Sequence, residues 1–344
     1  MTERVLVVRL DSDGDVLASG PAVRAAAAGR DGRPAEVTFL CGPRGRQAAG
    51  MLPGVRHIIE WVCPWIVPDP PEVSRDDIED LVGRLAAGRF DVALVLTSFH
   101  QSPLPMALLL RLAGVPQIAA ISPDYPGSLL DHRIRPGRDM DDDQPEPLRA
   151  LRVATEAGFA LPAGDGGKLK VLPSPEVRWL TGEEPYVVLH PGASVPARAW
   201  SPSRCAEAVA KLRADGWQVV VTGSKSEREL TAFVSGCDAV DLGGRTAYAE
   251  LAGVLAGARA VVVGNTGPAH LAAAVGTPVV SLFAPVVPAK RWAPYGVPVR
   301  LLGDQQAACA GSRATRCPLY GHPCLNSITA DDVVAAVNSL VGKR

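Results

Sequence analysis

The stretch that most constrains this chain runs from residue 258 to residue 285, ARAVVVGNTGPAHLAAAVGTPVVSLFAP. The apolar runs at 260–263 and 279–283 predict two buried strands, and the small residues between them predict a helix. The tetrapeptide GNTG at 264–267 has turn chemistry, and Pro268 suits a first helical turn. Two parallel strands joined by a helix leave free backbone N–H groups at the helix start, where an anion can bind. The stretch therefore predicts either a phosphate-binding turn or an ordinary tight turn in an α/β unit.

The rest of the chain repeats this alternation of strand and helix patterns. Over the first 120 residues, strand patterns such as 4–10 and 90–96 alternate with helix patterns such as 16–28, and a loop is expected at 122–144. A second alternating series begins at 186. We therefore predict an α/β protein with two Rossmann-like, doubly wound domains that face each other across a cleft. Their expected bounds are 1–172 and 186–326, with a Pro- and Glu-rich linker at 173–185 and a C-terminal helix at 327–344 that could pack back on the first domain.

Composition limits the partners that this chain can have. Its 344 residues are 47% hydrophobic and carry a formal net charge of −1, so bulk charge does not favour nucleic acid or an anionic membrane. No apolar run approaches the ~18 residues that span a bilayer, and the N-terminus leads into a strand without a signal-peptide pattern. We expect a cytoplasmic, monomeric protein with at most peripheral membrane contact.

The seven cysteines are scattered, which suits reduced thiols. One cluster stands out near the C-terminus: Cys309, Cys317, His322 and Cys324. Its spacing fits no standard zinc motif, so unligated thiols or a local disulfide are favoured over a bound metal, although all three stay open.

Acidic residues crowd the loop after the first strand, at Asp11, Asp13 and Asp15. Carboxylates favour helix N-termini, so these residues can be purely structural. D-S-D-G-D also copies the opening of an EF-hand loop, but Val16 and Ala22 stand where that loop needs glycine and a bidentate glutamate. The calcium interpretation is therefore set aside.

Three glycine-containing loops follow strand patterns in the second domain: HPGAS at 190–194, TGS at 222–224 and GNTG at 264–267. Because the carboxyl ends of parallel strands share one edge of a sheet, these loops should converge. Convergence favours a ligand site over three unrelated turns.

Two tandem Rossmann-like domains suggest the GT-B architecture of glycosyltransferases. The motifs RVLVVRLDSDGDVLASGPAVRA, VVLHPGAS, ARAWSP and GNTGPAHLAAAVGTPVVSLFAP resemble, in content and spacing, those of glycosyltransferase family 9, the ADP-heptose:lipopolysaccharide heptosyltransferase family. The resemblance covers nearly the whole chain. It implies an inverting transfer of a heptose or related sugar from a nucleoside-diphosphate donor to a hydroxyl acceptor, without a metal or other cofactor.

The resemblance also implies roles for individual residues. In that family the Asp of the N-terminal Gly-Asp-Val motif is the proposed general base, which here is Asp15. Arg198 would grip a phosphate bidentately, and the amides of Thr266, Gly267 and Ala269 would hold the diphosphate against the helix dipole. The other implied donor contacts are Gly192, Ala193, Ser194, Gly223, Ser224, Thr246, Asn265, Pro268 and His270, and Gly14 and Asp13 would bind the acceptor.

One position departs from the family pattern. Many members have Asp-Thr-Gly where this chain has Asn265-Thr266-Gly267, and an amide adds an NH2 donor and loses a charge. A donor other than ADP-heptose and a nucleotide-sugar-binding protein without transfer activity therefore stay open. A dinucleotide oxidoreductase is disfavoured, because the first loop lacks G-x-G-x-x-G. The acceptor could be lipopolysaccharide core, another glycan or a small molecule.

Overall fold

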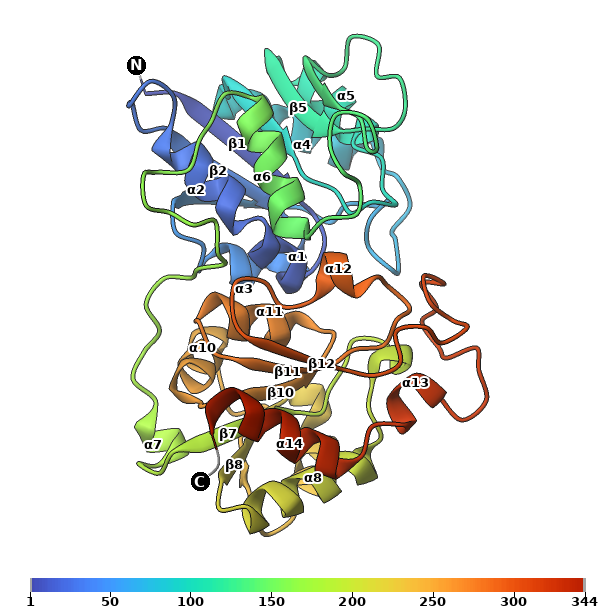
Figure 1. Ribbon diagram of the computed structural model, residues 1–344. Coiled ribbons are helices and arrows are strands. Elements are labelled where there is room, and N and C mark those ends of the chain that lie inside the picture. Colours follow the sequence, from blue (N-terminus) through green and yellow to red (C-terminus); the bar gives the residue numbers. More distant parts are fainter. Residues whose placement is uncertain (1, 343–344) are drawn as a thin grey trace. The chain divides into compact units, whose positions relative to one another are not determined.

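The structure, a computed structural model shown in Figure 1, describes residues 2–342. The chain divides into two compact units, whose boundary in the sequence lies between Leu172 and Pro173. Each unit is an α/β domain with one six-stranded parallel sheet. Between residues 2 and 342, no helix combines the length and the apolar character needed to cross a bilayer.

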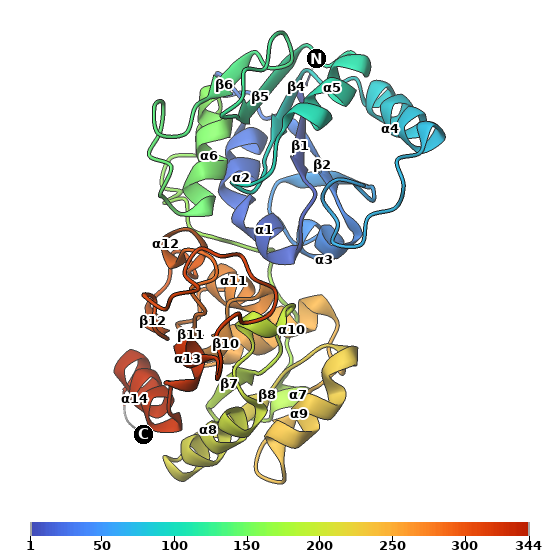
Figure 2. The ribbon, with the colours of Figure 1, turned by 90° about the vertical axis from the view of Figure 1, so that its right-hand side faces the viewer.

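The sheet of the first unit has the strand order β3-β2-β1-β4-β5-β6. Its central strand, β1 (Arg4–Arg9), is buried on both faces because helices cover both sides, which explains its continuous apolar run. In Figure 2, α2 and α6 lie on one face of this sheet and α4 and α5 on the other. The other strands are β2 (Glu36–Cys41), β3 (Val55–Glu60), β4 (Val92–Val95), β5 (Gln117–Ile121) and β6 (His132–Ile134). The helices are α1 (Asp13–Ala18), α2 (Gly20–Ala28), α3 (Arg46–Ala49), α4 (Arg75–Gly88), α5 (Leu104–Leu112) and α6 (Glu146–Glu156).

The sheet of the second unit has the order β12-β11-β10-β7-β8-β9, which is the same Rossmann order read from the other edge. One apolar core lies between this sheet and α8, α9 and α14, while α10 and α11 belong to the opposite face. The strands are β7 (Tyr186–His190), β8 (Gln218–Val221), β9 (Val240–Asp241), β10 (Val261–Gly264), β11 (Val279–Leu282) and β12 (Val299–Leu302). The helices are α7 (Arg178–Thr181), α8 (Pro202–Ala214), α9 (Arg228–Ser235), α10 (Tyr248–Gly257), α11 (Gly267–Ala274), α12 (Ala289–Trp292), α13 (Pro323–Asn326) and α14 (Ala330–Val341).

The prediction of two doubly wound Rossmann-like domains is confirmed, but local details differ. The helix expected at 16–28 is two helices that meet at Ser19, whose hydroxyl donates to the carbonyl of Asp15. Pro21 has no N–H to continue the helical bonding, which explains the break. The loop expected at 122–144 contains β6, a three-residue edge strand too short to show a pattern.

The C-terminal helix contributes to the core of the second unit. α14 packs against α8, and Val333 and Val337 are fully buried in this core. A further contact of the helix with the first domain stays a prediction from the sequence. Lys211 on α8 also binds both oxygens of Asp331, at 2.6 and 2.7 Å. The apolar face of the helix is therefore covered within its own unit.

Candidate functional site

Three loops meet at the carboxyl edge of the second sheet, because β10, β7 and β8 are neighbours in it. The loops that follow these strands are the three glycine-containing segments described above, and we call this edge the rim. His190, the last residue of β7, lies with its Nδ1 3.1 Å from Oγ1 of Thr222, which follows β8, so two of the loops touch. The amide of Gly244, which precedes Thr246 and α10, donates to the carbonyl of Gly223 at 2.8 Å. The strand order reverses between β7 and β10, where doubly wound proteins bind ligands.

The turn between β10 and α11 contains a buried side chain with an unused donor. Asn265 is 5% exposed, and its Nδ2 has no hydrogen-bond partner within the described part of the chain. Thr266 is the N-cap residue of α11 in an extended conformation, and both it and Gly267 are half-exposed. Their amides are therefore placed where a ligand could reach them.

Ala269 does not fit the expected phosphate contact. Its amide donates to the carbonyl of Thr266 at 3.0 Å, and the residue is 1% exposed. The tight first turn of α11 thus uses this donor internally. His270 is also buried, at 6% exposure, whereas Pro268 is half-exposed at the start of the helix.

Arg198 ends a short 3-10 helix, Pro196–Arg198, beside the same turn. A Cβ placed on Gly264 would lie 3.0 Å from the carbonyl oxygen of Arg198, so these backbones are in close contact. The short helix is held at Ala197, whose amide donates to Thr315 at 3.0 Å and whose carbonyl lies 3.1 Å from Nε2 of His322. The structure therefore brings Arg198 next to the GNTG turn.

The cysteine cluster is mostly a packing feature. Cys309 and Cys324 are 2% and 1% exposed and belong to the apolar core, and burial, more than the neighbouring thiols Cys309 and Cys317, raises the pKa of Cys324 to about 11. None of the seven cysteines, which all lie within residues 2–342, forms a disulfide bond. Across residues 2–342, no group of three or more Cys, His, Asp or Glu side chains is arranged to hold a metal ion.

Glu227 is a rim residue that sequence reasoning missed. Its Oε2 accepts from the amide of Ser224 at 2.7 Å and from the hydroxyl at 2.8 Å. Its carboxylate also fills the space beside Gly192, where an added Cβ would lie 1.9 Å from Oε1. The Ser-x-x-Glu spacing at 224–227 is a capping box and was the available signal. Of the remaining candidates in the HPGAS loop, Ala193 is half-exposed and Ser194 is exposed.

In the first unit, Asp15 lies in the first turn of α1, just after the carboxyl end of β1. Its Oδ1 accepts from Nη2 of Arg9 at 2.9 Å, and its Oδ2 accepts from the hydroxyl and amide of Ser12 at 2.9 and 3.3 Å. The side chain is 16% exposed. A carboxylate oxygen has two lone pairs, and Oδ1 accepts only one of these hydrogen bonds. Oδ1 can therefore still accept a proton from another group.

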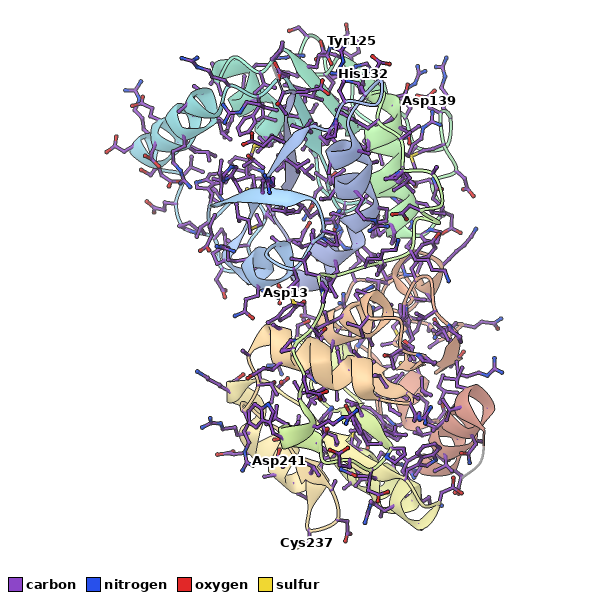
Figure 3. All side chains as sticks on the ribbon, turned by 90° about the vertical axis from the view of Figure 1, so that its left-hand side faces the viewer. Asp13, Tyr125, His132, Asp139, Cys237 and Asp241 are labelled. Carbon is purple, nitrogen blue, oxygen red and sulfur yellow. The ribbon has the colours of Figure 1, made fainter. Side chains whose placement is uncertain are left out.

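Asp13 opens the same helix, as Figure 3 shows. Its Oδ1 accepts from the amide of Ala48 at 3.3 Å, while Gly14 beside it is buried. Burial raises the pKa of Asp13 to about 6, although the Ala48 amide and the charge of Arg44 lower it. The three acidic residues of this loop therefore have different environments, which their spacing did not reveal.

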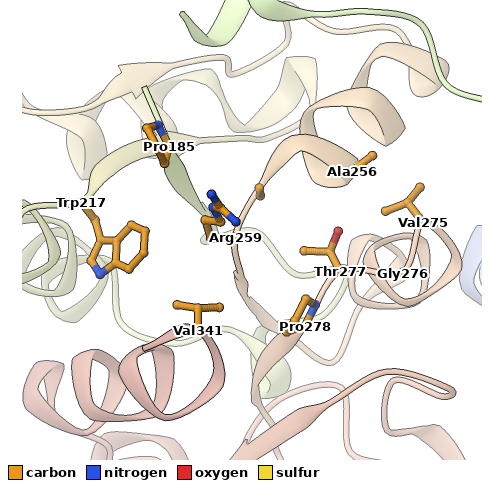
Figure 4. Close-up of a pocket in the computed structure, with 10 residues that line it drawn as sticks. Pro185, Trp217, Ala256, Arg259, Val275, Gly276, Thr277, Pro278 and Val341 are labelled. Carbon is orange, nitrogen blue, oxygen red and sulfur yellow. The ribbon is translucent and has the colours of Figure 1, made fainter. Parts of the chain in front are cut away.

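A surface cavity of about 580 Å³ in the second unit lies away from the rim (Figure 4). Pro185, Arg259 and Pro278 line it, and they precede or begin β7, β10 and β11. It therefore lies at the amino edge of the sheet, opposite the three loops, and forms no part of the candidate site.

Comparisons with known proteins agree with this architecture. The sequence model of glycosyltransferase family 9 (heptosyltransferase) matches residues 141–321, just over half of the chain. Lipopolysaccharide heptosyltransferase 3 of Escherichia coli is 29% identical over 164 residues, which cover 45% of this chain and 47% of that protein. The chain thus spans about half the length of the curated relatives it matches first.

Two solved structures share the whole fold. ADP-heptose lps heptosyltransferase II of E. coli superposes with a TM-score of 0.74 at 22% identity, covering 98% of both chains. A glycosyl transferase of family 9 from Veillonella parvula gives a TM-score of 0.76 at 17% identity, covering 98% of this chain and 97% of that one. These likenesses show the fold, which is the GT-B fold expected from the sequence. The family match over residues 141–321 shows that this chain belongs to glycosyltransferase family 9, the heptosyltransferase family.

Proposed function

We propose that this protein is an inverting, metal-independent glycosyltransferase of lipopolysaccharide biosynthesis. It transfers a heptose or related sugar from a nucleoside-diphosphate donor, ADP-heptose in the first instance, to a hydroxyl of a glycan or small-molecule acceptor. The observation that carries the proposal is the meeting of three glycine-containing loops at the switch point of the second sheet. One of these loops buries Nδ2 of Asn265, which has no hydrogen-bond partner among residues 2–342. Family membership supplies the reaction class.

The rim has the chemistry that a nucleoside diphosphate needs. The amides of Thr266 and Gly267 lie at the start of α11, where the helix dipole favours negative charge. Arg198, beside this turn, can donate two parallel hydrogen bonds to a phosphate and stabilise the charge of the departing diphosphate. Positive charge at the leaving group then comes from the protein, so a metal is not required.

Asp15 is suited to the other half of the reaction. It would take the proton of the acceptor hydroxyl while that oxygen forms a bond to the anomeric carbon. The bond between this carbon and the diphosphate breaks on the opposite face, and the nucleoside diphosphate leaves with the electron pair. Attack from one face and departure from the other invert the anomeric centre. A positioned general base typically contributes about 10²–10⁴ in rate.

The test begins with a thermal-shift panel of nucleoside diphosphates and nucleotide sugars. A ligand at 100 times its Kd should stabilise the protein by about 2.7 kcal/mol. Donors that bind are then assayed for transfer to lipopolysaccharide core acceptors, with and without EDTA. The proposal expects transfer that EDTA leaves unchanged. Binding without transfer to any acceptor would instead support a nucleotide-sugar-binding protein, and a lack of binding by every nucleotide would overturn the donor site.

The role of Asp15 has its own test. Asp15→Asn should lower kcat by about 10²–10⁴ and leave donor affinity nearly unchanged, because Asp15 belongs to the first unit and the donor rim to the second. Initial rates at saturating donor, together with calorimetric donor binding, separate the two effects. Equal losses of rate and affinity, or an unaffected rate, would make Asp15 a structural residue.

A further inference from the structure

The last residue of β1, Arg9, is a buried cation that contacts three carboxylates. Its Nε lies 2.8 Å from Oδ2 of Asp11, and its Nη1 lies 3.8 Å from Oε2 of Glu146. Its Nη2 donates to Oδ1 of Asp15 and to the hydroxyl of Ser98, each at 2.9 Å. The Arg9 side chain is 3% exposed. Nη2 thus makes two hydrogen bonds, whereas Nε forms an ion pair with Asp11 and has no hydrogen bond of good geometry among the described residues.

The partners of Arg9 come from elements that the fold brings together. Asp11 is held by Nε2 of Gln101 at 2.6 Å, and the same Gln101 side chain accepts from the amide of Ser98 at 2.9 Å. Glu146, on α6, is itself 3% exposed. Burial alone would lower the pKa of Arg9, but Asp11, Asp15 and Glu146 raise it on balance, so Arg9 stays charged. A planar guanidinium can serve these separate directions at once, which a lysine ammonium cannot.

This arrangement holds both carboxylate oxygens of Asp15. Arg9 binds Oδ1, and Ser12 binds Oδ2. We propose that Arg9 is a positioning residue for sugar transfer: it holds the Asp15 carboxylate in one orientation and offsets the negative charge of Asp11 and Glu146 beside it. The inference rests on the proposed function, in which Asp15 is the base.

Removal of the guanidinium should therefore lower the rate more than it lowers donor binding. Arg9→Met leaves Asp15 held by Ser12 alone, among two other carboxylates. A misplacement of about 1 Å can cost on the order of 100-fold in rate. We expect kcat to fall by about 10- to 100-fold with the donor KM within about twofold of wild type, because the donor rim lies in the other unit.

Arg149 provides a matched control within the same cluster. Its side chain is also 3% exposed, and it lies 2.7 Å from Asp142 and 3.2 Å from Glu146, but no contact joins it to Asp15 among the ion pairs and hydrogen bonds of the described residues. Arg149→Met should therefore lower the melting temperature about as much as Arg9→Met while kcat stays within about threefold of wild type. Arg9→Lys, which keeps the charge but not the fork, should have a kcat between those of wild type and Arg9→Met. Equal losses of kcat in Arg9→Met and Arg149→Met would overturn the proposal.

A second measurement does not need transfer activity. Urea unfolding of wild type, Arg9→Met, Asp15→Asn and the double variant forms a double-mutant cycle on the full chain. If Arg9 holds Asp15, the unfolding equilibrium constant of the double variant should differ by about tenfold from the value expected for two independent substitutions. Additive effects would overturn the proposal even if the enzyme transfers sugar. A wild type that transfers no sugar, combined with strong coupling, would remove the proposed function but leave the Arg9–Asp15 contact established.

Discussion

Replacing Gly192 by alanine would place a methyl group where Glu227 already lies. The added Cβ would be 1.9 Å from Oε1, 2.4 Å from Cδ and 2.8 Å from Oε2 of Glu227. These atoms cannot move freely, because Oε2 accepts from the amide and hydroxyl of Ser224 at 2.7 and 2.8 Å. We expect the methyl group both to expel Glu227 from its cap and to displace the backbone of the HPGAS loop.

The cost follows from these two consequences. Loss of a capping interaction is worth about 1 kcal/mol, and overpacking of a tight site adds about 1–3 kcal/mol. Gly192→Ala should therefore lower the free energy of unfolding by roughly 2–4 kcal/mol, since the two costs act together. For a unit of this size, that corresponds to a fall in Tm of roughly 5–15 °C. Donor binding should weaken as well, because the displaced loop is part of the rim.

Urea unfolding and differential scanning calorimetry measure this loss. Gly166→Ala is the control, because a Cβ at Gly166 meets nothing within 4 Å among the described residues, and we expect a change of at most about 1 kcal/mol. The double variant Gly192→Ala, Glu227→Ala should recover the overpacking part of the loss, about 1–3 kcal/mol, since the clash is gone, but not the roughly 1 kcal/mol of the lost cap. A Gly192→Ala protein as stable as wild type, or one that Glu227→Ala does not relieve, would refute the steric argument.

Three further predictions concern single side chains. Because the pKa of Asp13 is about 6 in the folded protein and about 3.9 when unfolded, its contribution to stability is fully present below about pH 4 and is lost as the pH rises through 6. Asp13→Asn should therefore raise the free energy of unfolding at pH 8 by up to roughly 3 kcal/mol and leave it unchanged at pH 3. If the free energy of unfolding of the two proteins depends on pH in the same way, this reasoning is wrong. Arg198→Ala should weaken calorimetric binding of free nucleoside diphosphate by about 1.5–3 kcal/mol and slow transfer, whereas unchanged binding would show that Arg198 does not hold the phosphates. Asn265→Asp should preserve or raise turnover of ADP-heptose if that is the natural donor. It should abolish turnover of a donor whose oxygen accepts a hydrogen bond from Nδ2. Unchanged turnover of every nucleotide sugar would leave Asn265 as a turn residue.

The amino-acid sequence alone was enough for the architecture and for the convergence of the three glycine-containing loops at one edge of the second sheet. Buried parallel strands carry continuous apolar runs, and glycine turns follow them at regular intervals, so the two Rossmann-like domains could be predicted. The GNTG turn showed where β10 gives way to α11. These features depend on residues that are close together in the chain, and such local patterns remain visible in the sequence.

The tertiary structure decided which side chains meet. Arg9 and Ser98 are 89 positions apart, and only the pairing of β1 with β4 brings their loops together. Glu227 became a rim residue because a 3-10 helix turns it toward Gly192, and Ala269 lost its expected role because the first turn of α11 uses its amide. The direction in which α14 buries its apolar face was likewise set by α8. Contacts of this kind depend on strand order and helix packing, which bring distant residues together, whereas sequence periodicity reports only which face of each element is apolar.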